Sequence, residues 1–311
     1  MRFLVVGAGA LGGYFGGRLL EAGEDVTFLV RPRRSAQLAK TGLVIKSPRG
    51  DFTSPSPPTV QADGIDGPCD VVIVGCKAYD LAETMNSFAP AVGPNTAILP
   101  MLNGMRHLDD LAKRFGREHV LGGLGMISAV LDDAGTVLHL SDVHGLTYGE
   151  LDGSRSQRML ALDAAFAKAR FDGVASDNIL QDMWEKWVLI ASAASMTCLM
   201  RATVGDIVRS GAADLANGMV DECVAIARHN GFAPRAPAVE RARAILTASD
   251  SMMTASMFKD IERGAPIEAD HIVGDLLRRG ADGKHSSLLR VAYAHLKAYE
   301  ARRAREARPG S

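Results

Sequence analysis

Short apolar runs alternate with helical patterns through the first third of the sequence. The runs are almost continuously apolar, which is typical of parallel strands covered on both faces. The segments around them have helical periodicity. The predicted strands are 2–6, 24–30, 42–46, 69–75 and 97–102, and the predicted helices are 13–21, 80–89 and 108–115. This alternation predicts an α/β fold with a doubly wound sheet.

The pattern changes after residue 129. Segments 136–140 and 146–149 resemble antiparallel strands that complete the sheet, and a helix at 159–169 and a strand at 171–174 follow. From Ile179 the pattern is helical, with breaks at Gly205, 231–237, 264–266 and 280–284. We therefore expect a Rossmann-type N-terminal domain over residues 1–176 and an all-helical C-terminal domain over residues 177–311.

A glycine pattern of the type G-x-G-x-x-G follows the first predicted strand. Gly7 allows a tight turn, Gly9 lets the backbone approach a pyrophosphate, and Gly12 permits close packing of helix on strand. The helix that follows offers its N-terminal N–H groups to phosphate. The alternative is a buried glycine turn without a ligand. The residues predicted to bind a dinucleotide here are Gly7, Ala8, Gly9, Ala10, Leu11 and Gly12.

Arginine stands at the end of the second predicted strand, where an NAD site usually carries Asp or Glu for the ribose 2′-hydroxyl. The residue is Arg31, and Arg33 and Arg34 follow it. Guanidinium groups suit a 2′-phosphate better than a bare hydroxyl. The pattern predicts NADP(H), and the alternative is a solvated basic loop.

Two polar residues follow later strands of the predicted sheet, at the edge where open α/β sheets bind ligands. Lys77 comes after 69–75 and Asn103 after 97–102. We expect both to contribute to cofactor and substrate binding. Lys77 could instead be the solvated start of a helix, and Asn103-Gly104 could be a plain turn.

Lys186 lies at the start of a strongly apolar predicted helix. Ile190 and Ala194, four and eight positions further on, are apolar and share its face. Burial disfavours the charged ammonium and lowers its pKa, which suits a proton donor near neutral pH. The alternative is a snorkelling lysine with its stem on Trp187.

Further candidates occur near the C-terminus. Ser256 begins the segment Ser-Met-Phe-Lys-Asp, and Glu268 lies in Ile-Glu-Ala-Asp. Pro266 is expected to open a helix, so Glu268 could be only a first-turn carboxylate.

Composition restricts the partners and the compartment. The formal net charge of −1 over 311 residues gives no general attraction to nucleic acid or membrane. The longest apolar run, 187–200, falls short of the ~20 residues that span a bilayer. The four cysteines show no C-x-x-C spacing and no metal-type pairing with histidine. We expect a cytoplasmic protein with reduced thiols, no metal site, and neither nucleic-acid nor membrane partners.

Together these motifs resemble the ketopantoate reductase (2-dehydropantoate 2-reductase) family, and the likeness extends over most of the chain. It rests on the glycine pattern with Arg31, on Lys77, on Asn103-Gly104-Met105, on Trp184-Glu185-Lys186, and on the segments that begin at Ser256 and Ile267. The order and spacing of so many short motifs make the resemblance specific.

The resemblance implies an NADPH-dependent reductase that transfers hydride to a 2-keto acid, with 2-dehydropantoate as the leading substrate. It implies that Lys186 is the general acid that protonates the carbonyl oxygen. The family residues matched by Asn103, Ser256 and Glu268 bind and orient the keto acid, and Glu268 is grouped with Lys186 as catalytic. Lys77 matches a lysine near cofactor and substrate.

One departure concerns the substrate. Family members that reduce ketopantoate typically carry Asn four and eight positions after the lysine, where this sequence has Ile190 and Ala194. An apolar pocket accepts apolar substituents, so a more apolar 2-keto or 2-hydroxy acid is the alternative, as for a D-2-hydroxy-acid dehydrogenase. A non-catalytic NADP-binding regulator is a third reading. Apolar helix faces in the second domain make a homodimer a candidate assembly.

Overall fold

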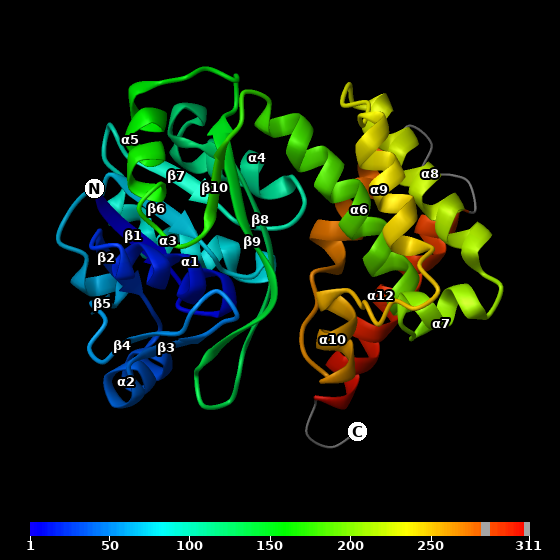
Figure 1. Cartoon of the computed structure of the whole chain (residues 1–311), viewed down its shortest axis with the longest axis horizontal. Coiled ribbons are helices and arrows are strands. Elements are labelled where there is room, and N and C mark those ends of the chain that lie inside the picture. The colour runs from blue at the N-terminus through cyan, green and yellow to red at the C-terminus, as the bar shows by residue number, and fades with distance from the viewer. Residues whose placement is uncertain (281–286, 308–311) are drawn as a thin grey trace. The chain divides into compact units, whose positions relative to one another are not determined.

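The computed structural model describes residues 1–280 and 287–307, which form two compact units (Figure 1). The first comprises Met1–Leu102 and His107–Ile179. The second comprises the chain from Leu180 onward together with the short segment Asn103–Arg106. The α/β fold class predicted from the sequence is confirmed, with a parallel sheet in the first unit and helices in the second.

A five-stranded parallel sheet forms the centre of the described part of the first unit. Its order is β5-β2-β1-β6-β7. Every residue of β1, β6 and β7 except Arg2 is buried, because helices and a second sheet cover them. The strands are β1 (Arg2–Val6), β2 (Asp25–Leu29), β5 (Thr59–Val60), β6 (Val71–Val74) and β7 (Ala97–Pro100).

A second sheet replaces the predicted completion of the first one. β8 (Leu121–Leu131) and β9 (Val137–Glu150) form a long antiparallel hairpin, and β9 also pairs in parallel with β3 (Leu43–Lys46) and β10 (Asp172–Ala175). β4 (Phe52–Ser54) pairs with β3. The prediction that 136–140 and 146–149 are two strands of the first sheet is therefore wrong. β8 pairs with both ends of β9, residues 137–139 and 144–150, and the polar middle of β9 lies between them at an irregularity in the register.

Helix α1 (Ala10–Glu21) lies between the two sheets of the first unit. A Cβ atom on Gly16 would lie 2.7 Å from the ring of Phe28 in β2, and one on Gly17 would lie 2.6 Å from Ile45 in β3. Two adjacent faces of α1 therefore contact different sheets, so closely that neither glycine leaves room for a Cβ atom. This packing fixes the helix whose N-terminus follows the glycine turn.

Helix α2 (Pro32–Thr41) is not predicted by the sequence pattern. Leu38 is its only buried residue among the described ten, so no apolar stripe marks it. Pro32 opens the helix, as its fixed φ favours, and Arg31 is the N-cap. The other helical segments of this part are η1 (Ala62–Gly64), η2 (Ala78–Asp80), α3 (Leu81–Phe88), η3 (Ala89–Ala91), α4 (Arg106–Phe115), η4 (Arg117–His119) and α5 (Gln157–Phe166).

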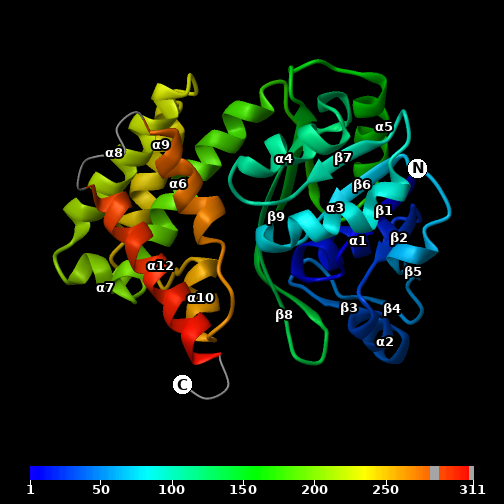
Figure 2. The ribbon, with the colours of Figure 1, turned by 180° about the vertical axis from the view of Figure 1, so that it is seen from behind.

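The described part of the second unit is built from helices. Figure 2 shows α12 running from beside α8 toward α10. The predicted break at Gly205 is wrong, because α7 includes it; the chain turns earlier, at Arg201, where φ is +54°. Residues 281–284 of the last predicted break lie outside the described residues. The elements are α6 (Ile179–Met200), α7 (Val204–Arg209), α8 (Ala213–His229), α9 (Ala236–Leu246), α10 (Ser256–Glu262), a π-helical turn η5 (Asp270–Gly274), α11 (Asp275–Arg279) and α12 (Leu288–Glu306).

The described residues contain neither a membrane-spanning helix nor a cluster of metal-ligating side chains. None of the helices described is long and apolar enough to cross a membrane. Residues 1–280 and 287–307 contain no group of three His, Cys, Asp or Glu side chains that could hold a metal ion.

Candidate active site

A cleft of about 600 Å³ lies in the first unit at the carboxyl ends of its parallel strands. Residues from the ends of β1, β2 and β6 line it, and Leu131 of β8 contributes from the second sheet. Such a volume is typical of a small-molecule site. The cleft occupies the position in which open α/β sheets bind their ligands.

The glycine turn forms one wall of this cleft. Gly7, Ala8 and Gly9 line it, whereas Ala10, Leu11 and Gly12 belong to the first turn of α1. Gly7 has a φ of +88°, and a Cβ on Gly12 would lie 1.9 Å from the carbonyl oxygen of Gly7. A Cβ on Gly9 would meet no atom within 4 Å. The backbone at Gly9 can therefore be approached closely, and the helix N-terminus favours an anion there.

The three arginines after β2 have different surroundings. Arg31 lines the cleft, and its side chain is exposed. Arg34 also lines the cleft, but its Nε donates to the Ala8 carbonyl at 3.0 Å and its Nη2 to the Gly135 carbonyl at 3.1 Å. Burial lowers the pKa of Arg34. Arg33 is exposed and outside the cleft lining, so three convergent guanidinium groups are not formed.

Of the two polar residues predicted at strand ends, Lys77 lines the cleft and Asn103 does not. Lys77 is half-buried and is the N-cap residue of η2. Asn103 is half-buried, follows β7 by three residues and is grouped with the second unit. The structure therefore assigns the two residues to different parts of the chain.

Lys186 is the eighth residue of α6, further into the helix than predicted. Burial lowers its pKa from 10.5 to about 8, against the opposing charge of Glu268. At pH 7 about nine-tenths of such a lysine is protonated, so it holds a proton and releases it readily. Ala194 on the same face is buried, and Ile190 is half-buried.

Glu268 is buried and lies immediately before a short helical segment. Its carbonyl accepts a hydrogen bond from the Ile272 N–H at 3.0 Å. Pro266 does not open a helix, contrary to the prediction, because helical structure begins only at Ala269. The π-helical turn that follows is a geometry that recurs at functional sites.

Two anchors fix the segment that carries Glu268. The Trp187 indole N–H donates to the Ile272 carbonyl at 2.8 Å. On the other side, Asp270 accepts from Tyr293 at 2.7 Å and pairs with Lys297 at 3.1 Å. Because Trp187 adjoins Lys186 in sequence, the indole bond ties the two candidate residues to each other.

The turn at Asn103 contacts the same segment. Gly104 has a φ of +81°, and a Cβ there would lie 2.6 Å from the carbonyl oxygen of His271 and 3.8 Å from Trp187. Glycine is required at this turn, as the plain-turn reading expected. The same packing places Asn103 near the segment that carries Glu268 and near the residue after Lys186.

Ser256 is exposed and is the first residue of α10. The preceding residue, Ala255, donates its N–H to the Thr197 hydroxyl at 3.3 Å. Thr197 is eleven residues after Lys186 on α6, which corresponds to ~16 Å along the helix axis. Ser256 is therefore anchored to the lysine-bearing helix, about three turns further on.

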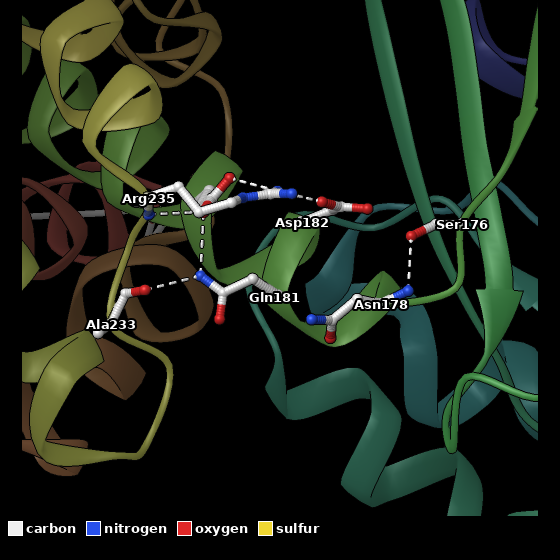
Figure 3. A network of polar contacts seen from close by, with 7 residues as sticks. Ser176, Asn178, Gln181, Asp182, Ala233 and Arg235 are labelled. Carbon is white, nitrogen blue, oxygen red and sulfur yellow. Dashed lines mark hydrogen bonds and ion pairs between the residues drawn. The ribbon is translucent and has the colours of Figure 1, made fainter.

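Arg235 makes interactions that hold the first turns of α6 and that no sequence pattern indicates (Figure 3). Arg235 contacts Asp182 and donates to the Glu185 carboxylate at 2.6 and 2.7 Å. Gln181 adds a bond to Glu185 at 3.0 Å. Burial alone would raise the pKa of Glu185, but the bonds from Arg235 and Gln181 hold it below its ordinary value. This Arg235 network fixes the residue next to Lys186.

Comparisons with known proteins show the family of this chain. The family description "Ketopantoate reductase PanE/ApbA" matches residues 3–153, and its C-terminal counterpart matches residues 178–300. An uncharacterized oxidoreductase of Bacillus subtilis is 40% identical over 307 residues, 97% of this chain and 99% of that protein. The crystal structure of 2-dehydropantoate 2-reductase from Geobacter metallireducens is 30% identical with a TM-score of 0.86, covering 96% of this chain and 99% of that one.

A second similar structure is a ternary complex of D-mandelate dehydrogenase with NADH and anilino(oxo)acetate. It has a TM-score of 0.86 at 20% identity and covers 98% of this chain and 100% of that one, so it shows the fold alone. The chain has a glycine turn on a parallel sheet, and a helical unit follows in the sequence. This arrangement defines a Rossmann-type protein with two units. Within that class, the chain belongs to the ketopantoate reductase PanE/ApbA family, an oxidoreductase family.

Proposed function

We propose that this protein is an NADPH-dependent reductase of a 2-keto acid, with 2-dehydropantoate as the leading substrate and pantoate as its product. The observation that carries the proposal is the pKa of Lys186. Burial lowers this pKa to about 8, although the charge of Glu268 acts to raise it. A lysine in this state is a suitable general acid at neutral pH. Family membership and the 2-dehydropantoate 2-reductase from Geobacter metallireducens support the substrate class.

The residues of the first unit fit a nicotinamide dinucleotide. Gly9 leaves its backbone open to a pyrophosphate, and Arg31 offers a guanidinium group at the end of β2. We assign cofactor binding to the turn from Gly7 to Gly12, to Arg31 and to Lys77, and we keep Asn103 as a candidate contact. When bound, the reduced cofactor supplies the hydride for the carbonyl carbon.

The residues of the second unit account for the proton and for orientation. Lys186 holds a proton at Nζ and donates it to the carbonyl oxygen as that oxygen becomes a hydroxyl group. We assign Glu268 two roles: its charge keeps Lys186 protonated, and its carboxylate orients the substrate. Asn103 and Ser256 offer an amide and a hydroxyl group to the keto acid.

The face of α6 that carries Lys186 favours one alternative substrate class. Ile190 and Ala194 offer no hydrogen bond to a substrate hydroxyl group, so a more apolar 2-keto or 2-hydroxy acid also fits the chemistry. A dehydrogenase of an aromatic 2-hydroxy acid with the same fold exists, although at 20% identity it supports only the architecture.

Oxidation of NADPH by the purified protein tests the proposal, with 2-dehydropantoate compared to benzoylformate and a branched 2-keto acid. Preferred turnover of 2-dehydropantoate supports the leading assignment, and preferred turnover of benzoylformate supports the alternative. Lys186→Ala should lower kcat by at least about a hundredfold, while the exposed control Lys113→Ala should not. Binding of NADPH without turnover of any acid would refute a reductase and favour a regulator.

A further inference from the structure

Arg31 has two carboxylate partners inside the cleft that it lines. Its Nη2 lies 3.3 Å from Asp80 Oδ1 and 3.3 Å from Glu83 Oε2. Asp80 is the N-cap residue of α3, and Glu83 lies in the first turn of that helix. The hydrogen bond and charge of Asp80, with the charge of Glu83, raise the pKa of Arg31. The guanidinium group that would meet a 2′-phosphate is therefore already paired.

Both carboxylates line the cleft themselves. A phosphate placed on Arg31 would lie close to two negative charges, and the guanidinium group would have to share its donors with them or leave them. An unphosphorylated ribose encounters neither cost, because its hydroxyl groups can donate to a carboxylate.

Arg34 offers less than a free guanidinium group to a phosphate. Three of its donors are engaged, by the Ala8 carbonyl, the Gly135 carbonyl and the Gln37 amide oxygen at 2.6 Å. It holds the glycine turn and the β8–β9 turn in place. Discrimination at the 2′ position therefore depends chiefly on Arg31 and its partners.

We propose that Asp80 and Glu83 compete with the 2′-phosphate for Arg31 and so determine how strongly the protein distinguishes NADPH from NADH. The two carboxylates are specificity-determining residues that weaken the preference for NADPH over NADH. This inference rests on the proposed use of the cleft for the cofactor.

The test measures binding of two probes that differ only by the 2′-phosphate, adenosine 2′,5′-bisphosphate and AMP, to the full chain by calorimetry. Because neither probe requires turnover, the result is independent of the substrate. The variants are Glu83→Gln, Asp80→Asn and the double variant. Asp51→Asn is the matched control, since Asp51 is paired with Lys46 and does not line the cleft.

Each single variant should bind the bisphosphate about two- to fivefold more tightly at low salt, which is the range for one exposed ion pair. The double variant should gain more. The affinity for AMP should not rise in these variants, and Asp51→Asn should change the affinity for neither probe. Equal changes for both probes, or no change for the bisphosphate, would overturn the competition. Arg31→Met should abolish the gain in the double variant. If the wild-type protein binds neither probe, the assignment of the cleft to the cofactor is refuted together with the competition. If both probes respond as expected but no keto acid is turned over, the cofactor assignment stands and only the reductase activity is refuted.

Discussion

Replacing Glu268 with glutamine should move the basic limb of the pH–rate profile to lower pH. Burial lowers the pKa of Lys186 to about 8, and the charge of Glu268 opposes that fall. Glutamine keeps the size of the side chain and removes its charge. The ammonium then stays desolvated without its anion, so its pKa falls further and the protonated form is lost at a lower pH.

The size of the shift follows from two quantities. The fall from 10.5 to about 8 corresponds to ~3 kcal/mol against the charged lysine. A nearby opposite charge shifts a pKa by about one to three units, and Glu268 is the charge that acts on Lys186. Removing that charge should therefore lower the pKa by about one unit or more. At pH 7 the protonated fraction would fall from about nine-tenths to about half.

The assay is kcat/KM for keto acid reduction between pH 6 and pH 10. The wild-type rate should fall above about pH 8 and the rate of Glu268→Gln above about pH 7. Glu262→Gln, which removes an exposed partner of Arg201, is the charge-matched control and should keep the wild-type limb. A Glu268→Gln profile whose limb stays in place or moves upward would refute the electrostatic role, even if KM rises. The pH–rate profile of Lys186→Ala should lack this basic limb.

Three further predictions concern supporting contacts. Arg235→Met should lower the free energy of unfolding by about 1–2 kcal/mol in urea titration, because the largely buried Glu185 loses its ion pair with the half-exposed Arg235 and keeps only the bond from Gln181; a change below about 0.5 kcal/mol would mean that water replaces the pair. Thr197→Val should raise KM for the keto acid about two- to tenfold with kcat little changed, since one hydrogen bond to the start of α10 is lost; a loss confined to kcat would contradict this role. His144 is bonded to Tyr14 at 2.7 Å, and burial lowers its pKa. The neutral ring therefore stabilises the folded state fully above pH 6.5, and this contribution is lost as the pH falls toward the lowered pKa. Urea titrations from pH 7.5 to pH 5 should show this loss, at most about 1.4 kcal/mol per pH unit, and His144→Gln should flatten it.

The first strand, glycine turn and helix could be predicted because every signal for them is local. β1 is apolar, the turn needs glycine for steric reasons, and α1 begins within three residues of the predicted start. Helix α2 could not be predicted because its sequence is strongly polar and supplies a single buried leucine, too few apolar residues to reveal a helical period.

The second sheet could not be predicted because its pairings are distant in sequence. Ile45 of β3 pairs with Val137 of β9, ninety-two positions later. In addition, β9 contains the polar residues Ser141 and Asp142, which interrupt the apolar alternation that marks a strand. β8 pairs with β9 on both sides of these residues, and such a long-range pairing leaves no mark in the local pattern.

The same distinction applies to the candidate site. The lowered pKa of Lys186 follows from helical spacing, because apolar neighbours on one face imply desolvation. The interactions that place the lysine do not follow from spacing. Arg235 is fifty positions from Glu185, and Ile272 is eighty-five from Trp187. Charged and aromatic residues of this kind have too many potential partners in a sequence for any pairing to be read from it.

The anchors of α6 also explain how substrate selectivity could change while the lysine stays in place. Arg235 holds one side of the helix and Trp187 another, and neither anchor involves Ile190 or Ala194. Ala194 is 2% exposed, so Ala194→Asn would bury an amide that costs about 1–3 kcal/mol unless a substrate hydroxyl satisfies it. An amide there is useful only with a substrate that bonds to it, whereas alanine carries no such cost. Under the proposed function, apolar residues at these two positions would favour the stability of the free protein and place no demand for a hydroxylated substrate.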